Sequence, residues 1–581
     1  MNLKNYLCFL LLIVVFTSNV LYAQSNKNTV RIWEISDPYG LNPLTSYSAS
    51  AKYMMDNIFC TLLDYDPQTI KLRPQLAVAL PLVKELEEGE YAGGMSLTYE
   101  IHPKARWDDG KPVTAQDYIF TIKAMKNPKV YAGVLRQYYE FIDKIETDAE
   151  NPKKFTIYSK EIYFLAETAS GTLHVLPQHI YDEDGLMNKF SIQELNDLDN
   201  QEGLLDNEDI LEFATRFNSK KFEQETVVGC GPYALEDWIS NDKIILTRKK
   251  KWWGDRVKKQ AALVAYPDKI EHVIIPDPNN AIIELKAGNL DVARSLSPVN
   301  YMELKEDSEF TKQYELHTPD QFAYYYIGFN TKDPRLADKR VRRAFAHLVS
   351  VDWIIDSMYY DLASPVSGPI HPSKDYCNKD LSKIVFSLDK AKELLKEAGW
   401  KDTDNDGVLD KIIDGEKQSF EFTFQYNQGN LVRKSIGLEL QKVAKEVGIK
   451  IELQAFEWTI FLDNVKKREF DLLCLAWVQS PDLDDMRQIW HRESDTPDGS
   501  NRVGFGNAKS DKIIDKIRVT LDPEKRKELY LKIQEIIYEE QPYIFLFIPK
   551  GRIAISKRFE HAGTSALRPG YNVRSFKLRK K

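Results

Sequence analysis

Cysteine is scarce in this chain of 581 residues, and its five cysteines form no recognisable motif. Four of them follow the N-terminal region, at Cys60, Cys230, Cys377 and Cys474, with wide spacings and no CxxC pair. This spacing excludes a small disulfide scaffold and a zinc cluster, which both need closely spaced cysteines. The sequence assigns no disulfide, and we expect some of these residues to be ordinary buried thiols.

Catalytic motifs are absent as well. The chain has no HExxH, no GxSxG and no phosphate-binding GxxxxGK[ST], and its nine histidines are scattered without ligand spacing. Asp108 and Asp109 form an acidic pair, as glycoside hydrolases need, but adjacent acids before Gly-Lys-Pro are typical of a turn. A secreted hydrolase is therefore disfavoured, and we predict a protein that is not an enzyme and needs no cofactor.

Neither sign of charge dominates the chain. Its formal net charge is −8, the basic residues are spread throughout, and the basic end, Arg574 to Lys581, is short. Nucleic acid is therefore not expected as a partner.

One apolar run at the N-terminus predicts export. Lys4 precedes the run from Leu7 to Phe16, and Ala23 follows at a distance suited to signal-peptidase cleavage. Ten apolar residues are too few to span a bilayer, which takes about 20. A lipoprotein needs a cysteine just after the run, whereas Cys8 lies inside it. We expect a signal peptide over residues 1–23 and a periplasmic protein without a lipid anchor.

More than 550 residues remain, enough for two or three domains. Between Phe420 and Trp477, apolar and polar residues first alternate as in a strand, and apolar residues then recur at helical spacing. A second alternating segment follows, and after it come a short helical stretch and a continuous apolar strand. This β-α-β-α-β pattern predicts an α/β fold with mixed sheets and flanking helices. Helices are also predicted after the capping residues Asp338, Ser387 and Asp522.

The strand that ends at Trp477 leads directly into a polar loop. Gln479, Ser480, Asp482, Asp484 and Asp485 follow within eight residues. Since ligands of open α/β sheets bind beyond the carboxyl ends of the strands, this loop offers a stacking face and acceptors for a cationic group. A polar loop whose tryptophan packs into the core is the equally weighted alternative.

A second acidic loop has a calcium-like spacing. Asp402, Asp404, Asp406 and Asp410 surround Gly407, as in the first half of a calcium-binding loop. The twelfth position is Ile413 rather than a bidentate acid. We therefore favour a solvated turn before a hairpin and retain the four aspartates as a weak calcium candidate.

The run from Thr98 to Asp117 resembles the signature of the family-five extracellular solute-binding proteins, the peptide- and nickel-type binding proteins of ABC importers. Further blocks resemble the family in the same order along nearly the whole chain. They are Val175–Tyr181, Val228–Tyr233, Lys251–Gly254, Leu285–Ala293, Gly328–Asn330, Glu397–Trp400 and Glu540–Tyr543.

The resemblance implies a two-lobed periplasmic-binding-protein fold of the large type II, with an extra sub-domain on the first lobe. The implied boundaries are 24–72, 219–322 and 541–581 for the first lobe, 73–218 for its sub-domain and 323–540 for the second lobe. It also implies a monomer that encloses a peptide or peptide-like solute and delivers it to a membrane permease. Other solutes, such as an oligosaccharide, a nickel chelate or a modified peptide, stay open.

The resemblance implies the binding residues too. Peptide-binding members keep two tryptophans, which Trp458 and Trp477 match, and the implied contacts are Trp458, Ala476, Trp477, Val478, Gln479, Ser480 and Asp482. Ser480 stands where these members place the aspartate that pairs with the ligand's α-ammonium, so Asp482 or Asp484 replaces it or the ligand has no free amino terminus. Val465 and Cys474 occupy positions where relatives can carry a carboxylate-binding arginine.

Overall fold

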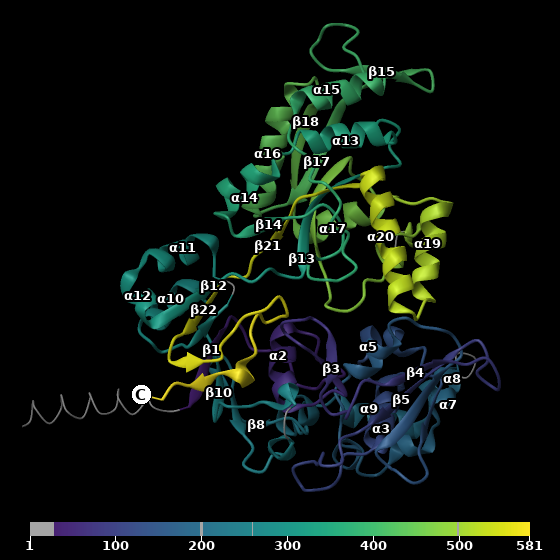
Figure 1. Cartoon of the computed structure of the whole chain (residues 1–581), viewed down its shortest axis with the longest axis vertical. Helices are drawn as coiled ribbons and strands as arrows, with labels where there is room; N and C mark the ends of the chain where they lie inside the picture. The colour runs from purple at the N-terminus through teal and green to yellow at the C-terminus, as the bar shows by residue number, and fades with distance from the viewer. Residues whose placement is uncertain (1–27, 198–200, 258–259, 295, 497–498, 581) are drawn as a thin grey trace, which may run out of the picture.

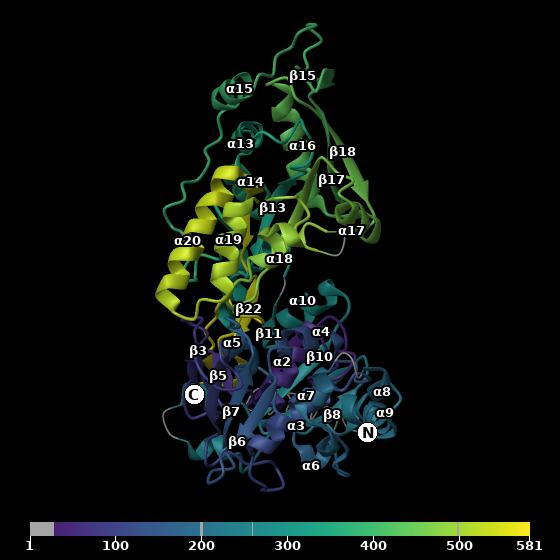
Figure 2. The ribbon, with the colours of Figure 1, turned by 90° about the vertical axis from the view of Figure 1, so that its right-hand side faces the viewer.

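The computed structural model describes residues 28–580 except 198–200, 258–259, 295 and 497–498. The predicted signal peptide, residues 1–23, lies outside this range. Within the described residues, no helix has the length and apolar character needed to cross a membrane. The chain forms two lobes, drawn one above the other in Figure 1 and Figure 2.

The first lobe, at the bottom of both views, is built on a mixed seven-stranded sheet in the order β12-β22-β11-β1-β10-β9-β8. The central strand β1 runs parallel to β10 and β11, while the outer pairs are antiparallel. The strands are β1 (Thr29–Glu34), β8 (Tyr233–Ile239), β9 (Lys243–Arg248), β10 (Lys269–Ile274), β11 (Val292–Ala293), β12 (Tyr314–His317) and β22 (Ile553–Ser556).

A four-stranded antiparallel sheet, β4-β5-β7-β6, lies in the segment expected to form the sub-domain. Its strands are β4 (Leu82–Glu85), β5 (Met95–Glu100), β6 (Lys144–Thr147) and β7 (Lys154–Ser159). Helices α3 (Ala115–Lys126), α5 (Ala166–Gly171) and α9 (Glu208–Phe217) accompany it. Leu97 and Tyr118 of this region belong to the same buried cluster as Ile32 and Ile270 of the large sheet. The sub-domain and the rest of the first lobe therefore share one core.

The second lobe contains a five-stranded sheet in the order β18-β17-β19-β13-β20. β17 (Glu421–Asn427) runs parallel to both β18 (Lys450–Phe456) and β19 (Leu472–Val478). α16 (Leu431–Lys445) and α17 (Trp458–Lys467) connect these three strands, so the predicted β-α-β-α-β unit is confirmed. β13 (Ala323–Phe329) pairs antiparallel with β19 and with β20 (Tyr543–Phe545).

The three capped helices are confirmed in this lobe. Asp338, Ser387 and Asp522 each accept a hydrogen bond from a main-chain N–H of the first helical turn, which satisfies a donor that has no partner inside the helix. The helices are α13 (Lys339–His347), α15 (Leu388–Glu397) and α20 (Pro523–Glu540), and α14 (Val351–Tyr359) and α19 (Ala508–Arg518) lie beside them.

The structure places the start of the last first-lobe segment later than the resemblance implied. Residues from 541 onward were expected in the first lobe, but β20 pairs with β13, and β21 (Phe547–Pro549) pairs with β14 (Ala363–Pro365). The buried apolar run Tyr543–Ile548 completes the second-lobe core, so the chain returns to the first lobe only after Pro549.

Two chain segments connect the lobes, one before β13 and one after β21. They are hydrogen-bonded to each other, since the Gln321 N–H donates to Pro549 O at 3.0 Å and the Gly551 N–H donates to Pro319 O at 2.6 Å. A short double connection of this kind can act as a hinge, because only a few residues need to change their backbone angles when the lobes move.

Candidate functional site

Beyond the carboxyl end of β19, a cavity of about 440 Å³ lies between the two lobes. The second lobe contributes Trp477, Tyr324 and the loop of residues 479–485, which we call the interlobe loop. The first lobe contributes α5 and its surroundings, so that both lobes line this interlobe cavity. Its first-lobe residues include Leu135, Tyr138, Tyr139, Tyr163, Leu165, Thr168, Ala169 and Thr172.

The lobes touch at the edges of the cavity. The Tyr65 hydroxyl donates to the Asp482 carboxylate, and the Phe164 N–H donates to Arg518 O at 3.2 Å. In both views α5 lies directly below the ends of α19 and α20, which agrees with the second contact. These two contacts join the lobes next to residues that line the interlobe cavity.

Trp477 both packs into the core and lines the cavity, the two alternatives that the sequence left open for it. Its indole N–H donates to the Tyr543 hydroxyl at 3.2 Å, and its ring packs against the buried cluster of the second lobe. The remaining part of the ring lines the interlobe cavity, together with Tyr324, its cross-strand partner on β13. The tryptophan is therefore held rigidly by the core and still offers an apolar surface to a ligand.

Gln479 places an unused acceptor at the cavity. Its side-chain N–H donates to Pro369 O at 2.7 Å and its main-chain N–H donates to Phe322 O at 2.8 Å. Its Oε1 atom is buried and has no hydrogen-bond partner among the described residues. A buried acceptor without a partner is costly, so a small rearrangement of the Gln479 amide that turns this oxygen to the cavity would let it accept an N–H or O–H.

The three acids of the interlobe loop differ in their partners. Asp484 is 2.7 Å from the ammonium of Lys374, a side chain only 3% exposed, and accepts from the Tyr376 hydroxyl at 3.0 Å. Asp485 has Arg518 at 3.6 Å. Their negative charges are therefore already compensated inside the protein.

The Asp482 carboxylate forms no ion pair among the described residues, although the Lys374 ammonium donates to the main-chain oxygen of Asp482 at 2.7 Å. Its carboxylate accepts from two hydroxyls, those of Tyr65 and of Ser480, the latter at 2.5 Å. Burial and the neighbouring Asp482 carboxylate raise the pKa of Tyr65, so this phenol stays neutral and keeps its proton for the hydrogen bond. The Asp482 carboxylate thus lies at the wall of the interlobe cavity without a direct ion-pair partner, while Lys52 of the adjoining cavity acts on it from a greater distance.

A second cavity, of about 290 Å³, lies on the other side of Asp482 and is lined mostly by the first lobe together with Ser480, Pro481 and Asp482 of the interlobe loop. Ionisable side chains of the first lobe line it, among them Lys52, Asp56, Arg73, His174 and Arg574. Asp56 binds Lys52 at 3.0 Å and His174 at 2.9 Å, and these partners lower its pKa although burial opposes the shift. Thr172, Ser480 and Asp482 border both cavities, so the two spaces adjoin at the interlobe loop.

Two implied contact residues lie elsewhere. Trp458 begins α17, is 46% exposed and lines neither cavity; its ring lies 5.9 Å from the buried guanidinium of Arg433. Ala476 also lines neither cavity, because β19 side chains alternate and its side chain points to the opposite face from Trp477. Val478, Gln479, Ser480 and Asp482 do line the interlobe cavity.

The tyrosines of the first lobe were missed by the sequence analysis. Tyr65, Tyr139 and Tyr163 approach the interlobe loop from a segment more than 300 residues earlier, so no local pattern connects them to it. Burial and the Asp485 carboxylate raise the pKa of Tyr163 to about 12, which keeps its hydroxyl neutral. Lys374 and Tyr376, the partners of Asp484, were missed for the same reason.

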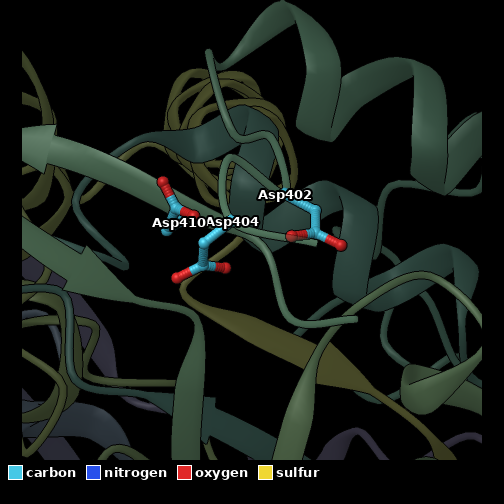
Figure 3. Close-up of side chains that lie close together, drawn as sticks. All are labelled: Asp402, Asp404 and Asp410. Atoms are coloured by element: carbon cyan, nitrogen blue, oxygen red, sulfur yellow. The ribbon is translucent and has the colours of Figure 1, made fainter. Parts of the chain in front are cut away.

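The calcium candidate gathers three of its four aspartates. Asp402, Asp404 and Asp410 offer carboxylate oxygens within 4.8 Å of one another, before strand β15 (Asp410–Ile413) (Figure 3). Lys417 of β16 (Glu416–Ser419) lies 2.6 Å from Asp404 and 3.3 Å from Asp410, so a protein cation already occupies the side of this group where those two carboxylates meet. Asp406 is not part of the group and accepts from the Val408 N–H at 2.8 Å. This hairpin loop, residues 402–410, has the geometry of the solvated turn that the sequence favoured.

Comparison with known proteins agrees with this architecture. The family model described as "Bacterial extracellular solute-binding proteins, family 5 Middle" matches residues 72–499. The chain is 27% identical over 553 residues to the oligopeptide-binding protein AppA of Bacillus subtilis, covering 94% of this chain and 91% of that protein. It is 22% identical to the dipeptide-binding protein of Escherichia coli, covering 88% and 87%.

Solved structures give the same result. The structure of Bacillus subtilis AppA in complex with a nonapeptide is similar with a TM-score of 0.65 at 25% identity, over 95% of this chain and 99% of that chain. The fold is also shared with NikZ of Campylobacter jejuni in complex with Ni(L-His), with a TM-score of 0.66 at 22% identity, over 95% and 99%.

Proposed function

Since the chain belongs to the bacterial extracellular solute-binding proteins of family 5, we propose that it encloses a peptide between its lobes and delivers it to the permease of an ABC importer. One observation carries the peptide assignment. A cavity lined by both lobes includes the face of Trp477, the side chain of Gln479 and the Asp482 carboxylate, which forms no ion pair among the described residues. Peptides have the matching groups, which are apolar side chains, N–H donors and an ammonium.

Asp482 takes over the position of the ammonium anchor in this proposal. Ser480 has no charge, and the charge of Asp484 is compensated by Lys374. Asp482 can accept an ammonium without breaking an ion pair of the protein, and its hydroxyl partners Tyr65 and Ser480 hold the carboxylate in place. A charge-assisted hydrogen bond of this type is about twice as strong as a neutral one.

The transport step follows from ligand contacts on both lobes. A peptide in the interlobe cavity touches α5 and the interlobe loop together, and it loses half of these contacts when the lobes separate. Its binding therefore favours the closed arrangement by the difference in contacts between the two states. The permease then recognises the closed form, and the protein works as a periplasmic monomer with no cofactor and no catalytic step.

Export is testable on the protein itself. N-terminal sequencing of protein recovered from the cell envelope is expected to begin at or near Gln24, the residue after Ala23. Recovery of a membrane-anchored form that keeps Met1 would contradict the export proposal.

Calorimetry tests the ligand assignment. The parent protein is titrated with di- to pentapeptides with free amino termini, the same peptides N-acetylated, an oligosaccharide and a nickel–histidine complex. We expect binding of the free-amino peptides, and a loss of about tenfold or more in affinity for them in Asp482→Asn, because one charge-assisted contact is removed. Asp463→Asn, on the exposed side of α17, is the matched control.

Two results would contradict parts of this proposal, and each points to a different part. Binding of only the oligosaccharide or the nickel complex would replace the peptide assignment. Tight binding of free-amino peptides that is unchanged in Asp482→Asn would keep the peptide and remove Asp482 as its anchor.

A further inference from the structure

Cys60 and Cys230 mark the two places where the chain leaves and re-enters the body of the first lobe. Cys60 follows helix α2 (Ala49–Ile58), and Cys230 precedes strand β8. The intervening residues include the four-stranded sheet of the sub-domain and its helices. A bond between these two residues closes the sub-domain at its base.

The backbones of the two segments are in direct contact. The Gly231 N–H donates to Ile58 O at 2.8 Å. A Cβ atom at Gly229 or Gly231 would lie 2.4 Å or 2.6 Å from the same carbonyl oxygen, so only glycine permits this approach on either side of Cys230. The distance between Cys60 and Cys230 is thus fixed by neighbouring main-chain contacts rather than by flexible side chains.

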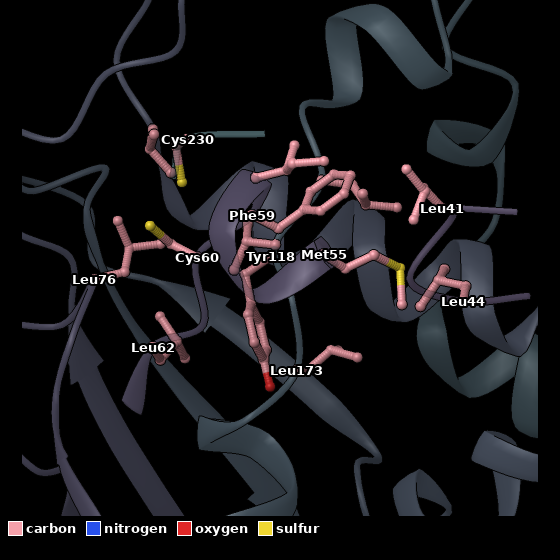
Figure 4. Close-up of a cluster of buried hydrophobic side chains, with 14 of the residues drawn as sticks. Leu41, Leu44, Met55, Phe59, Cys60, Leu62, Leu76, Tyr118, Leu173 and Cys230 are labelled. Atoms are coloured by element: carbon pink, nitrogen blue, oxygen red, sulfur yellow. The ribbon is translucent and has the colours of Figure 1, made fainter. Parts of the chain in front are cut away.

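Hydrogen bonds also fix the two cysteines individually. The indole N–H groups of Trp252 and Trp253 both donate to Cys230 O at 2.8 Å, and the Val175 N–H donates to Cys60 O at 3.0 Å. Both side chains are 1% exposed. Figure 4 shows their sulfur atoms directed toward each other at one edge of the first-lobe core, beside Leu62 and Leu76.

The Cys60 and Cys230 thiols are neighbours in the reduced form. Burial together with Cys60 raises the pKa of the Cys230 thiol well above its usual value. Their sulfur atoms are directed toward each other, as a disulfide requires, since its Cβ atoms must lie about 3.5–4.5 Å apart.

We propose that Cys60 and Cys230 form a disulfide in the exported protein, and that it ties the sub-domain to the body of the first lobe. Neither the family assignment nor the peptide proposal requires this bond. It depends on export, because disulfides persist in an oxidising compartment and are rare in the cytosol.

The bond forms by thiol–disulfide exchange with an external disulfide. One cysteine loses a proton, and its thiolate attacks the disulfide of the oxidant, which gives a mixed disulfide and releases one thiolate. The second cysteine, also as a thiolate, displaces the oxidant's remaining sulfur. Two protons and two electrons leave the protein, and the oxidant ends as a dithiol. Because burial suppresses the thiolate, this exchange takes place before the first-lobe core closes.

The remaining cysteines serve as internal controls. Cys474 lies in β19 of the second lobe, where burial raises the pKa of its thiol to about 12. The Cys377 thiol donates to Ile370 O at 3.4 Å in the same lobe. All four cysteines of the described residues are free thiols in this structure, and Cys377 and Cys474 lie in the second lobe, away from Cys60 and Cys230.

Mass spectrometry tests the bond. Protein recovered from the envelope is unfolded in an alkylating reagent without reductant, and the same protein is alkylated after reduction. We expect two alkyl groups in the first sample, four in the second, and a digest peptide that links Cys60 with Cys230. Four alkyl groups without reductant, or a link between any other pair, would overturn the proposal.

Thermal unfolding tests the stabilising effect. A crosslink between distant residues reduces the entropy of the unfolded chain, so reduction is expected to lower the melting temperature of the parent by several degrees. The variant Cys377→Ser/Cys474→Ala should keep this response, and Cys60→Ala/Cys230→Ala should lose it. An equal response to reductant in both variants would contradict the assignment.

Discussion

The interlobe loop and the hairpin loop are both rich in aspartate, both lie in the second lobe, and yet they differ in how their charges are compensated. The hairpin loop places the exposed Asp402 and Asp404 and the buried Asp410 around Lys417, whose side chain is 48% exposed. The interlobe loop pairs Asp484 with a buried lysine and leaves the Asp482 carboxylate without an ion pair at a cavity between two lobes. Asp402 also forms no ion pair among the described residues but is exposed, so a cluster of acids indicates a binding site only where an unpaired carboxylate is partly removed from water.

Removing Lys374, the lysine partner of the interlobe loop, gives the largest expected effect. Lys374→Met is expected to lower the free energy of unfolding by about 3 kcal/mol, because it leaves the Asp484 carboxylate without its buried partner. Urea denaturation of the second lobe measures this change. A loss comparable to that of an exposed lysine would show that Asp484 is effectively solvated.

Removing the tryptophan tests the wall of the cavity. Trp477→Ala is expected to weaken peptide binding by about 100-fold, because the ligand loses a rigid aromatic surface that the core holds in place. Calorimetry gives the affinity, and circular dichroism confirms that the variant is folded. Trp458→Ala is the control, since Trp458 lines neither cavity and its loss should change the affinity much less. The opposite order of effects would move the site to the face of Trp458.

The charge of Asp482 gives a smaller and more selective effect. Asp482→Asn is expected to reduce the affinity for free-amino peptides by about tenfold and to leave N-acetylated peptides nearly unchanged, because only the ammonium contact is charge-assisted. The ratio of the two affinities is the measured quantity. Equal losses for both kinds of peptide would mean that Asp482 acts through the shape of the loop rather than through its charge.

The hairpin loop should give the smallest effect. Lys417→Met removes an exposed cation, so the melting temperature is expected to change by less than about 1 °C and peptide affinity not at all. Addition of millimolar calcium to the parent should leave the melting temperature equally unchanged. A clear stabilisation by calcium would restore the loop as a cation site.

The sequence predicted those features that depend on neighbouring residues. The β-α-β-α-β unit followed from periodicity, and the helices after Asp338, Ser387 and Asp522 followed from their capping residues. Trp477 could be placed at the carboxyl end of β19 and Asp482 in the loop beyond it, since a strand end determines where the next residues lie.

Features that depend on distant residues could not be predicted. Asp484 pairs with Lys374, 110 residues earlier, and Asp482 meets Tyr65 of the other lobe. Trp458 was assigned to the pocket through the resemblance alone, but the start of α17 places its ring on Arg433. The boundary at 541 was wrong because the pairing of β20 with β13 leaves no local signal.

Hydrogen exchange on the free and peptide-saturated protein tests the central claim most directly. A peptide enclosed between the lobes should slow exchange in residues 163–172 of the first lobe and 477–486 of the second lobe together, while the hairpin loop 402–410 remains unchanged. Protection confined to one lobe, or protection of the hairpin loop alone, would contradict binding between the lobes.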